Sequence, residues 1–222
     1  LHKMEYRGYD SAGIALHQDD KIAHLRTLGK VKLLEEKMIS EKPRSKLGIA
    51  HTRWATHGEP SEENAHPHKS NERVYIVHNG IIENYLDLKD FLKKEGYSFS
   101  SQTDSELIAH MLEYFLSKDN TMLDAMYLTK EKLDGAYAIA AIDKEDDTNI
   151  IIARSKSPLL IGVGIDEFLA ASDPLAIGQL TNEFIFLEDG DVAEISSQSY
   201  TIYDESKNKV DREITNIDIS SQ

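Results

Sequence analysis

The sequence predicts an α+β domain in which antiparallel strands and helices are grouped rather than regularly alternated. Short strand-like segments, each bounded by polar residues or glycine, recur along the chain. Segments with helical periodicity fall mostly together in the middle of the chain, between residues 84 and 133. A parallel sheet needs a crossover, usually a helix, between successive strands, so this grouping favours antiparallel layers.

The predicted strands are short runs of aliphatic, aromatic and β-branched residues. Their lengths suit antiparallel pairing. In chain order they are Ala12–Leu16, Ile22–Leu28, Leu47–Ala50, Val74–Val77, Ala136–Ile142, Ile150–Arg154, Leu159–Val163, Phe168–Ala171, Phe184–Leu187, Val192–Ile195 and Tyr200–Tyr203.

The predicted helices repeat apolar residues every three or four positions. They cover Lys30–Ser40, Asn84–Gly96 and Met122–Leu133, together with a segment that follows Thr103-Asp104-Ser105-Glu106. That tetrapeptide has the form of a capping box, and an apolar stripe begins at Leu107. Gly96 is expected to end the second helix.

Glycine and proline are sparse, and no linker-like stretch or repeat interrupts the chain. This predicts one domain over residues 1–203, followed by a polar tail over residues 204–222 that forms a pairing strand or leads to another domain. The chain starts at Leu1 inside what resembles the end of an apolar-periodic segment, so a missing beginning is expected.

Composition narrows the possible partners and compartment. The 222 residues, 40% hydrophobic and 29% charged, are typical of a soluble globular protein. A formal net charge of −14 opposes binding to nucleic acid or to an anionic membrane. No apolar run is long enough to span a bilayer and no signal peptide opens the chain, so a cytoplasmic protein is expected. The absence of cysteine excludes disulfides and thiolate metal sites within these residues.

The densest group of unusual residues runs from Gly48 to Pro60, where a predicted strand enters a polar loop. Loops presented by a rigid strand often carry function. Arg53 suits bidentate pairing with a ligand carboxylate, and Trp54, the single tryptophan, suits closure over a small ligand. The competing interpretation pairs Arg53 with an acidic residue of the chain and packs Trp54 against its neighbours.

Two further positions carry alternative interpretations. Asn79-Gly80 after a strand is typical of a tight turn, but a side-chain amide beside an approachable backbone N–H also suits an oxyanion hole. Asp104, expected in the first helical turn, is explained by the helix dipole alone or by a cationic ligand. A zinc site is the weaker interpretation of the histidines, which lack helical metal-ligand spacing. The histidines in question are His51, His57, His66, His68 and His78.

Several long motifs, in register over nearly the whole chain, resemble the glutaminase domain of the glucosamine-6-phosphate synthase family. They are Tyr6-Arg7-Gly8-Tyr9-Asp10-Ser11-Ala12-Gly13, the His51–Pro60 loop, Asn64-Ala65-His66-Pro67-His68, His78-Asn79-Gly80-Ile81-Ile82-Glu83-Asn84, Thr103-Asp104-Ser105-Glu106, Ala153-Arg154-Ser155, Ala171-Ser172-Asp173 and Phe186-Leu187-Glu188-Asp189-Gly190-Asp191. This domain is a class II glutamine amidotransferase. The resemblance implies the four-layer αββα sandwich of the N-terminal-nucleophile hydrolases.

The resemblance also implies roles for individual residues. Arg53, helped by Thr56 and His57, would bind the glutamine α-carboxylate, and Asp104 would bind the α-ammonium. Asn79 and Gly80 would stabilise the tetrahedral oxyanion, and Trp54 would lie on a loop that closes the site. Arg7 and Gly8 would lie beside the nucleophile, which in the family is the thiol of an N-terminal cysteine with its own α-amino group as base.

The chain departs from the family in what it lacks. The resemblance puts the cysteine about twenty residues before Leu1, at the start of a strand-plus-helix segment, so the first strand of the sandwich is expected to be missing and a strand edge exposed. Also absent is the isomerase half, which binds fructose 6-phosphate and converts it with ammonia to glucosamine 6-phosphate. Whole enzymes of the family use L-glutamine, need no metal or organic cofactor and usually form homodimers.

Two alternatives stay open. One is another class II amidotransferase, such as the phosphoribosyl type, whose equivalent loop usually reads Arg-Tyr-Ser-Thr where this chain has Arg53-Trp54-Ala55-Thr56. The other is a non-catalytic module that binds an amino acid.

Overall fold

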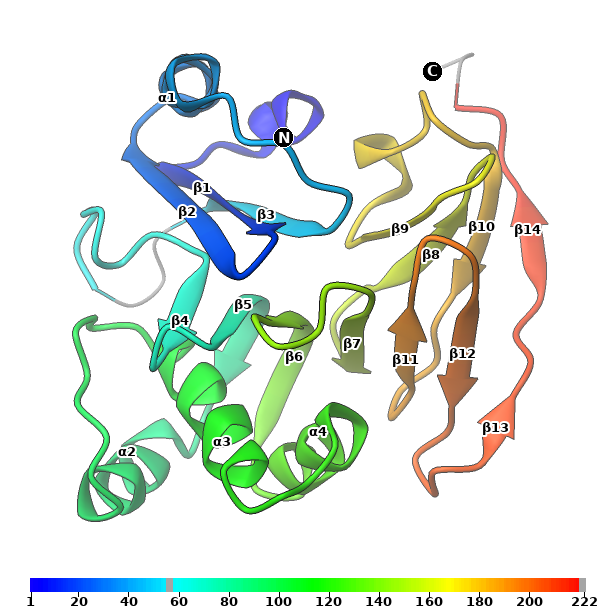
Figure 1. The fold of residues 1–222 in the computed structure, drawn as a ribbon. Coiled ribbons are helices and arrows are strands. Elements are labelled where there is room, and N and C mark those ends of the chain that lie inside the picture. The colour runs from blue at the N-terminus through cyan, green and yellow to red at the C-terminus, as the bar shows by residue number, and fades with distance from the viewer. Residues whose placement is uncertain (55–57, 220–222) are drawn as a thin grey trace.

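The computed structural model describes residues 1–54 and 58–219, and in it two β layers stack face to face with helices on the outside (Figure 1). One layer is a seven-stranded antiparallel sheet in the order β13-β12-β11-β7-β6-β5-β4. Its strands are β4 (His68–Ser70), β5 (Val74–Ile82), β6 (Gly135–Asp143), β7 (Ile150–Ser155), β11 (Val192–Ile195), β12 (Tyr200–Tyr203) and β13 (Lys209–Val210).

Three helices cover the outer face of this sheet: α2 (Tyr85–Lys94), α3 (Glu106–Leu116) and α4 (Met122–Lys130). The central helix α3 is apolar on most of its circumference because it packs between β5 and the helices on either side. Leu107 and Met111 are 1% and 0% exposed. Burying a side chain of this size stabilises the fold by about 1.5–3 kcal/mol.

The second layer consists of two smaller antiparallel sheets. One has the order β2-β1-β3 and the other the order β14-β10-β8-β9. Their strands are β1 (Ser11–Gln18), β2 (Lys21–Leu28), β3 (Gly48–Arg53), β8 (Leu160–Val163), β9 (Phe168–Ala171), β10 (Glu183–Phe186) and β14 (Ile214–Asn216). The helix α1 (Val31–Glu41) packs on the outside of β1 and β2, and the short 3-10 helices η1 (His2–Arg7) and η2 (Pro174–Ala176) lie nearby.

Apolar side chains from both layers interdigitate between them. Ile49 of β3 packs with Tyr75 of β5 and Ile142 of β6. Ile161 of β8 and Ile185 of β10 pack with the opposite end of the seven-stranded sheet. Helices outside two stacked sheets make the four-layer αββα sandwich, so the predicted fold is confirmed.

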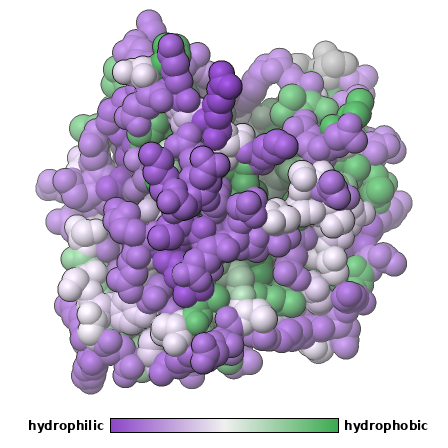
Figure 2. All heavy atoms as spheres, in the orientation of Figure 1, coloured by the Kyte–Doolittle hydropathy of each residue, from purple (hydrophilic) through white to green (hydrophobic). Residues whose placement is uncertain are grey.

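The strand β3 is one edge of the three-stranded sheet, and β9 is one edge of the four-stranded sheet. Residues of both edge strands line a single cavity. In the face shown in Figure 2, hydrophilic residues cover most of the surface, and hydrophobic residues show mainly at its centre and on the side of the four-stranded sheet. Among the described helices, none combines the length and apolarity required to cross a bilayer.

The strands and helices predicted from periodicity are all present, with ends that shift by a few residues. Gly96 follows α2 with a φ of +96°, as a helix stop requires. One strand, β4, was not predicted, and β13 and β14 lie in the tail for which a pairing strand was one of two alternatives; each of the three is only two or three residues long. The last two lie beyond Tyr203 and pair with β12 and β10. The boundary between domain and tail stays a prediction.

Candidate active site

A cavity of about 920 Å³ lies between the two β layers. It is lined by Arg53, Trp54, Asn79, Gly80 and Asp104 together with Gly8. The fold therefore brings together in one cavity these six residues, of which Gly8 and Asp104 are the farthest apart in sequence. Thr56 and His57 lie outside the described residues, and so does the side chain of Arg7.

Arg53 is the last residue of β3, and its side chain is 4% exposed. Its guanidinium Nη1 lies 3.2 Å from Oδ1 of Asp10, and Nη2 donates to the carbonyl of Gly58 at 3.0 Å. The ion pair with an acidic residue of the chain is thus present, and it does not exclude a ligand role. Guanidinium has five N–H donors, so a ligand carboxylate can bind to the same group. The scaffold fixes where that group lies.

Asp104 lies in the loop before α3 and is 3% exposed. Its Oδ2 accepts a hydrogen bond from the backbone N–H of Ile82 at 2.8 Å, which ties the loop to the end of β5. The prediction that it lies in the first helical turn was wrong, because α3 begins at Glu106. Its carboxylate is an anchored negative group on the wall of the cavity.

The predicted capping box was also wrong. Ser105 is the N-cap residue of α3 and makes no side-chain cap hydrogen bond. The Glu106 carboxylate instead accepts from the backbone N–H groups of Ser100 and Ser101, at 2.8 and 2.6 Å. Tertiary contacts with the preceding loop outweigh the local capping geometry because they satisfy two backbone donors at once. These bonds hold the loop that carries Asp104.

Asn79 and Gly80 lie inside β5, opposite Ala138 and Tyr137 of β6. The prediction that a strand ends in a tight turn here was wrong, since β5 continues to Ile82. Gly80 has a φ of +129°, and a Cβ at this position would lie 1.9 Å from the carbonyl oxygen of Ala136. The position therefore requires glycine because β6 approaches too closely for any side chain.

Trp54 follows β3 and is 66% exposed. One edge of its indole lies against Gly8, where an added Cβ would be 2.1 Å from Cζ3 of the indole. Gly8 has a φ of +76°, which glycine adopts without strain. The contact joins the loop after β3 to the end of η1, at the rim of the cavity.

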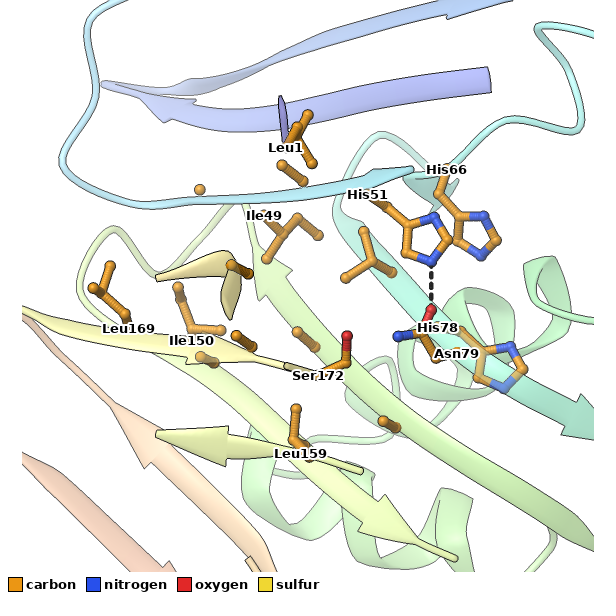
Figure 3. Close-up of a pocket in the computed structure, with 18 of the residues that line it drawn as sticks. Leu1, Ile49, His51, His66, His78, Asn79, Ile150, Leu159, Leu169 and Ser172 are labelled. Carbon is orange, nitrogen blue, oxygen red and sulfur yellow. Dashed lines mark hydrogen bonds between the residues drawn. The ribbon is translucent and has the colours of Figure 1, made fainter. Parts of the chain in front are cut away.

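Four histidines, His51, His66, His68 and His78, lie at or next to this cavity, an arrangement that was not predicted. The rings of His51 and His66 have centroids 4.1 Å apart (Figure 3). Those of His66 and His68 are 4.6 Å apart. Burial lowers the pKa of His51 and His78 to about 4 and that of His68 to about 3. These rings are therefore neutral at pH 7. Among the described residues, no three His, Asp or Glu side chains are arranged to hold a metal ion.

Two of these histidines are hydrogen-bonded to a residue of the site or to its neighbour in the chain. Nε2 of His51 lies 2.7 Å from Oδ1 of Asn79. Nδ1 of His78 lies 2.8 Å from Oγ of Ser105, next to Asp104. A signal for this arrangement was present in the sequence. His51 and Arg53 are two residues apart in one strand, so their side chains point to the same face.

Residues 51–179 match the protein family described as "Glutamine amidotransferase domain". Similar proteins include the glutamine–fructose-6-phosphate aminotransferases (isomerizing) of Haemophilus ducreyi and Haemophilus influenzae, each 51% identical over 96% of this chain. That of Vibrio parahaemolyticus is 49% identical over 97% of this chain. The chain spans 35% of the length of each of these curated relatives.

Solved structures with this fold include the glutamine phosphoribosylpyrophosphate amidotransferase of B. subtilis, which has a TM-score of 0.79 and 26% identity. The similarity covers 94% of this chain and 46% of that one. A glutamine aminotransferase class-II domain protein from Silicibacter pomeroyi superposes with a TM-score of 0.57 over 87% of this chain and 90% of that one. At 14% identity it shows the fold alone.

Proposed function

Because this chain belongs to the glutamine amidotransferase domain family, we propose that it binds L-glutamine and releases the side-chain amide nitrogen as ammonia within a longer enzyme. One observation carries the proposal for the site. A buried guanidinium, a buried carboxylate and a side-chain amide all line one cavity, at Arg53, Asp104 and Asn79. A free amino acid presents an α-carboxylate and an α-ammonium, and these are the groups that Arg53 and Asp104 complement.

We propose that Arg53 binds the α-carboxylate through a guanidinium that Asp10 and the Gly58 carbonyl already hold in place. Thr56 and His57, which follow in the same loop, are proposed to add donors to that carboxylate. Asp104 is proposed to accept from the α-ammonium while its Oδ2 stays bonded to Ile82. With both charged groups of the ligand held, the position of its side-chain amide in the cavity would be fixed.

The reaction needs a nucleophile, and the 222 residues contain no cysteine. We propose that a cysteine thiolate from outside these residues attacks the amide carbon, so that an S–C bond forms and negative charge develops on the oxygen. Asn79 Nδ2–H and the Gly80 N–H are proposed to donate to that oxygen. Collapse breaks the C–N bond, a proton from the thiol passes through the α-amino base to the departing nitrogen, and water then hydrolyses the thioester to glutamate. Gly8, with Arg7 beside it, is proposed to flank the nucleophile.

We propose that the segment carrying this cysteine lies at the cavity. The cavity is bordered by the edge strands β3 and β9, whose open backbone edges can each pair with one more strand. We propose that a strand bearing the nucleophile pairs there.

The acceptor of the ammonia is proposed from the sequence relatives. Proteins at 49–51% identity are named for fructose 6-phosphate, so we propose that the full-length protein makes glucosamine 6-phosphate. We also propose that it is a homodimer and acts in the cytoplasm. The phosphoribosyl alternative is supported by the likeness to the phosphoribosylpyrophosphate amidotransferase of B. subtilis, at 26% identity. The much higher identity to the fructose-6-phosphate enzymes favours the first acceptor.

The test uses the full-length protein with glutamine labelled with ¹⁵N in its side-chain amide. Transfer of ¹⁵N to fructose 6-phosphate, with release of glutamate, is the expected result. Transfer to phosphoribosyl pyrophosphate instead would replace the proposed acceptor. Calorimetry with the 222-residue chain tests binding by itself, with D-glutamine as the control. Failure to bind L-glutamine in preference to D-glutamine would contradict the proposed site.

A further inference from the structure

We propose that His51 is a positioning residue that fixes the Asn79 side-chain amide with its NH₂ group toward the cavity. The inference rests on the proposed glutaminase function, in which that NH₂ group donates to the oxyanion. Neither the family match nor the names of similar proteins assign a role to His51.

The contact between these two residues joins the two β layers. His51 lies in β3 and Asn79 in β5, and Nε2 of His51 is 2.7 Å from Oδ1 of Asn79. Figure 3 shows this bond, with the amide oxygen toward the imidazole and the amide nitrogen on the other side, toward the interior of the pocket. The side chain of Asn79 is therefore held at its oxygen end.

The bond matters because an asparagine amide has two ends of similar shape and opposite polarity. A rotation of half a turn about the Cβ–Cγ bond would exchange them and put a carbonyl oxygen where the oxyanion forms. Two oxygens with negative charge would then repel each other, and the donor would be lost. A donor at the back of the amide selects the useful orientation before substrate binds, which is the preorganisation that an oxyanion hole needs.

The tautomer of His51 follows from the same bond. Amide oxygen only accepts, so Nε2 of His51 must carry the proton and Nδ1 must be bare. Among the described residues, Nδ1 of His51 has no hydrogen-bond partner, as a bare nitrogen in this tautomer allows. The face of the ring rests on His66, which is 5% exposed, at a centroid distance of 4.1 Å. Stacking thus limits the tilt of the imidazole.

Two substitutions of equal polarity separate the role of Nε2 from that of the ring as a whole. In His51→Gln the side-chain amide reaches the position of Nε2 and can donate to Asn79. In His51→Asn the amide reaches only the position of Nδ1, so Asn79 loses its donor. Steady-state kinetics of glutamine hydrolysis are measured for both variants in the full-length protein, together with Asn79→Ala and the double variant His51→Asn/Asn79→Ala.

We expect His51→Asn to lower kcat by about 10- to 100-fold with a change in KM of less than about threefold, because only transition-state stabilisation is lost. His51→Gln should stay within about fivefold of the unaltered protein. In the double variant the loss should equal that of Asn79→Ala alone, since His51 acts only through Asn79.

Equal losses in the Gln and Asn variants, or losses that multiply in the double variant, would overturn the role of His51 while leaving the glutaminase function standing. Absence of glutamine hydrolysis in the unaltered full-length protein would instead remove the proposed function on which the inference rests. The two failures are therefore distinguishable.

Discussion

Arg53 and Asp10 are joined twice, through their side chains and through their backbones. Nη1 of Arg53 lies 3.2 Å from Oδ1 of Asp10, and the Asp10 N–H donates to the Arg53 carbonyl at 2.7 Å. The two side chains are only 4% and 16% exposed. The proposed carboxylate-binding group is thus also part of the structural core of the β1–β3 pair.

The first prediction separates these two roles. Arg53→Ala should raise the KM for glutamine at least about tenfold, because a charged hydrogen-bonded contact contributes about 1.5–3 kcal/mol. It should also lower the free energy of unfolding by about 3–5 kcal/mol, because it leaves the Asp10 carboxylate uncompensated. Adding Asp10→Asn should restore part of the stability without restoring KM. Kinetics and urea denaturation measure the two effects, and an unchanged KM would remove Arg53 from the site.

The second prediction concerns Asp104→Asn. The amide oxygen of asparagine can still accept from Ile82, so the fold should lose little stability, about 1 kcal/mol or less. The negative charge proposed to bind the α-ammonium is lost, and the affinity for L-glutamine should fall at least about tenfold. Calorimetry with the 222-residue chain measures the affinity. Binding that survives this change undiminished would assign Asp104 to the loop alone.

The third prediction compares two glycines with positive φ. Gly80→Ala would put a Cβ 1.9 Å from the Ala136 carbonyl oxygen and must force β5 from β6. Gly96→Ala meets no atom within 4 Å and bears only backbone strain at φ +96°. We expect about 1 kcal/mol of destabilisation for Gly96→Ala and at least about 3 kcal/mol for Gly80→Ala. Equal losses in denaturant titrations would show that β6 is not tightly packed against Gly80.

The fourth prediction is a loss of stability at mildly acidic pH. Burial lowers the pKa of His68 to about 3 and that of His78 to about 4, whereas in the unfolded chain both have a pKa near 6.5. Between about pH 6.5 and 4 the unfolded state therefore binds more protons than the native state, so stability falls as pH falls. Each histidine contributes about 2 kcal/mol between pH 7.5 and 5.

Urea titrations over this range measure the slope of unfolding free energy against pH. His68→Gln removes one of the buried histidines that contribute to this slope and should lower the slope by about 1.4 kcal/mol per pH unit. A stability that stays flat from pH 7.5 to 5 would mean that these histidines are hydrated and titrate normally.

Local pattern was enough to predict the helices and all but the shortest strands. Alternation and helical periodicity report which side of an element is apolar, and this is a property of neighbouring residues. The motifs added the four-layer arrangement and the set Arg53, Asn79, Gly80 and Asp104, four residues that line one cavity. Very short strands such as β14 carry too few residues to show a period.

Tertiary structure decided how those residues are held. The sequence alone determined which side chains are available, among them the guanidinium of Arg53, the amide of Asn79 and the carboxylate of Asp104. Their hydrogen bonds depend on which strands become neighbours. Glu106 accepts hydrogen bonds from the preceding loop instead of forming a capping box. Asp10 forms an ion pair with Arg53, and His51 is hydrogen-bonded to Asn79 across the two layers. These partners depend on packing between segments far apart in the chain, so the periodicity of neighbouring residues cannot predict them.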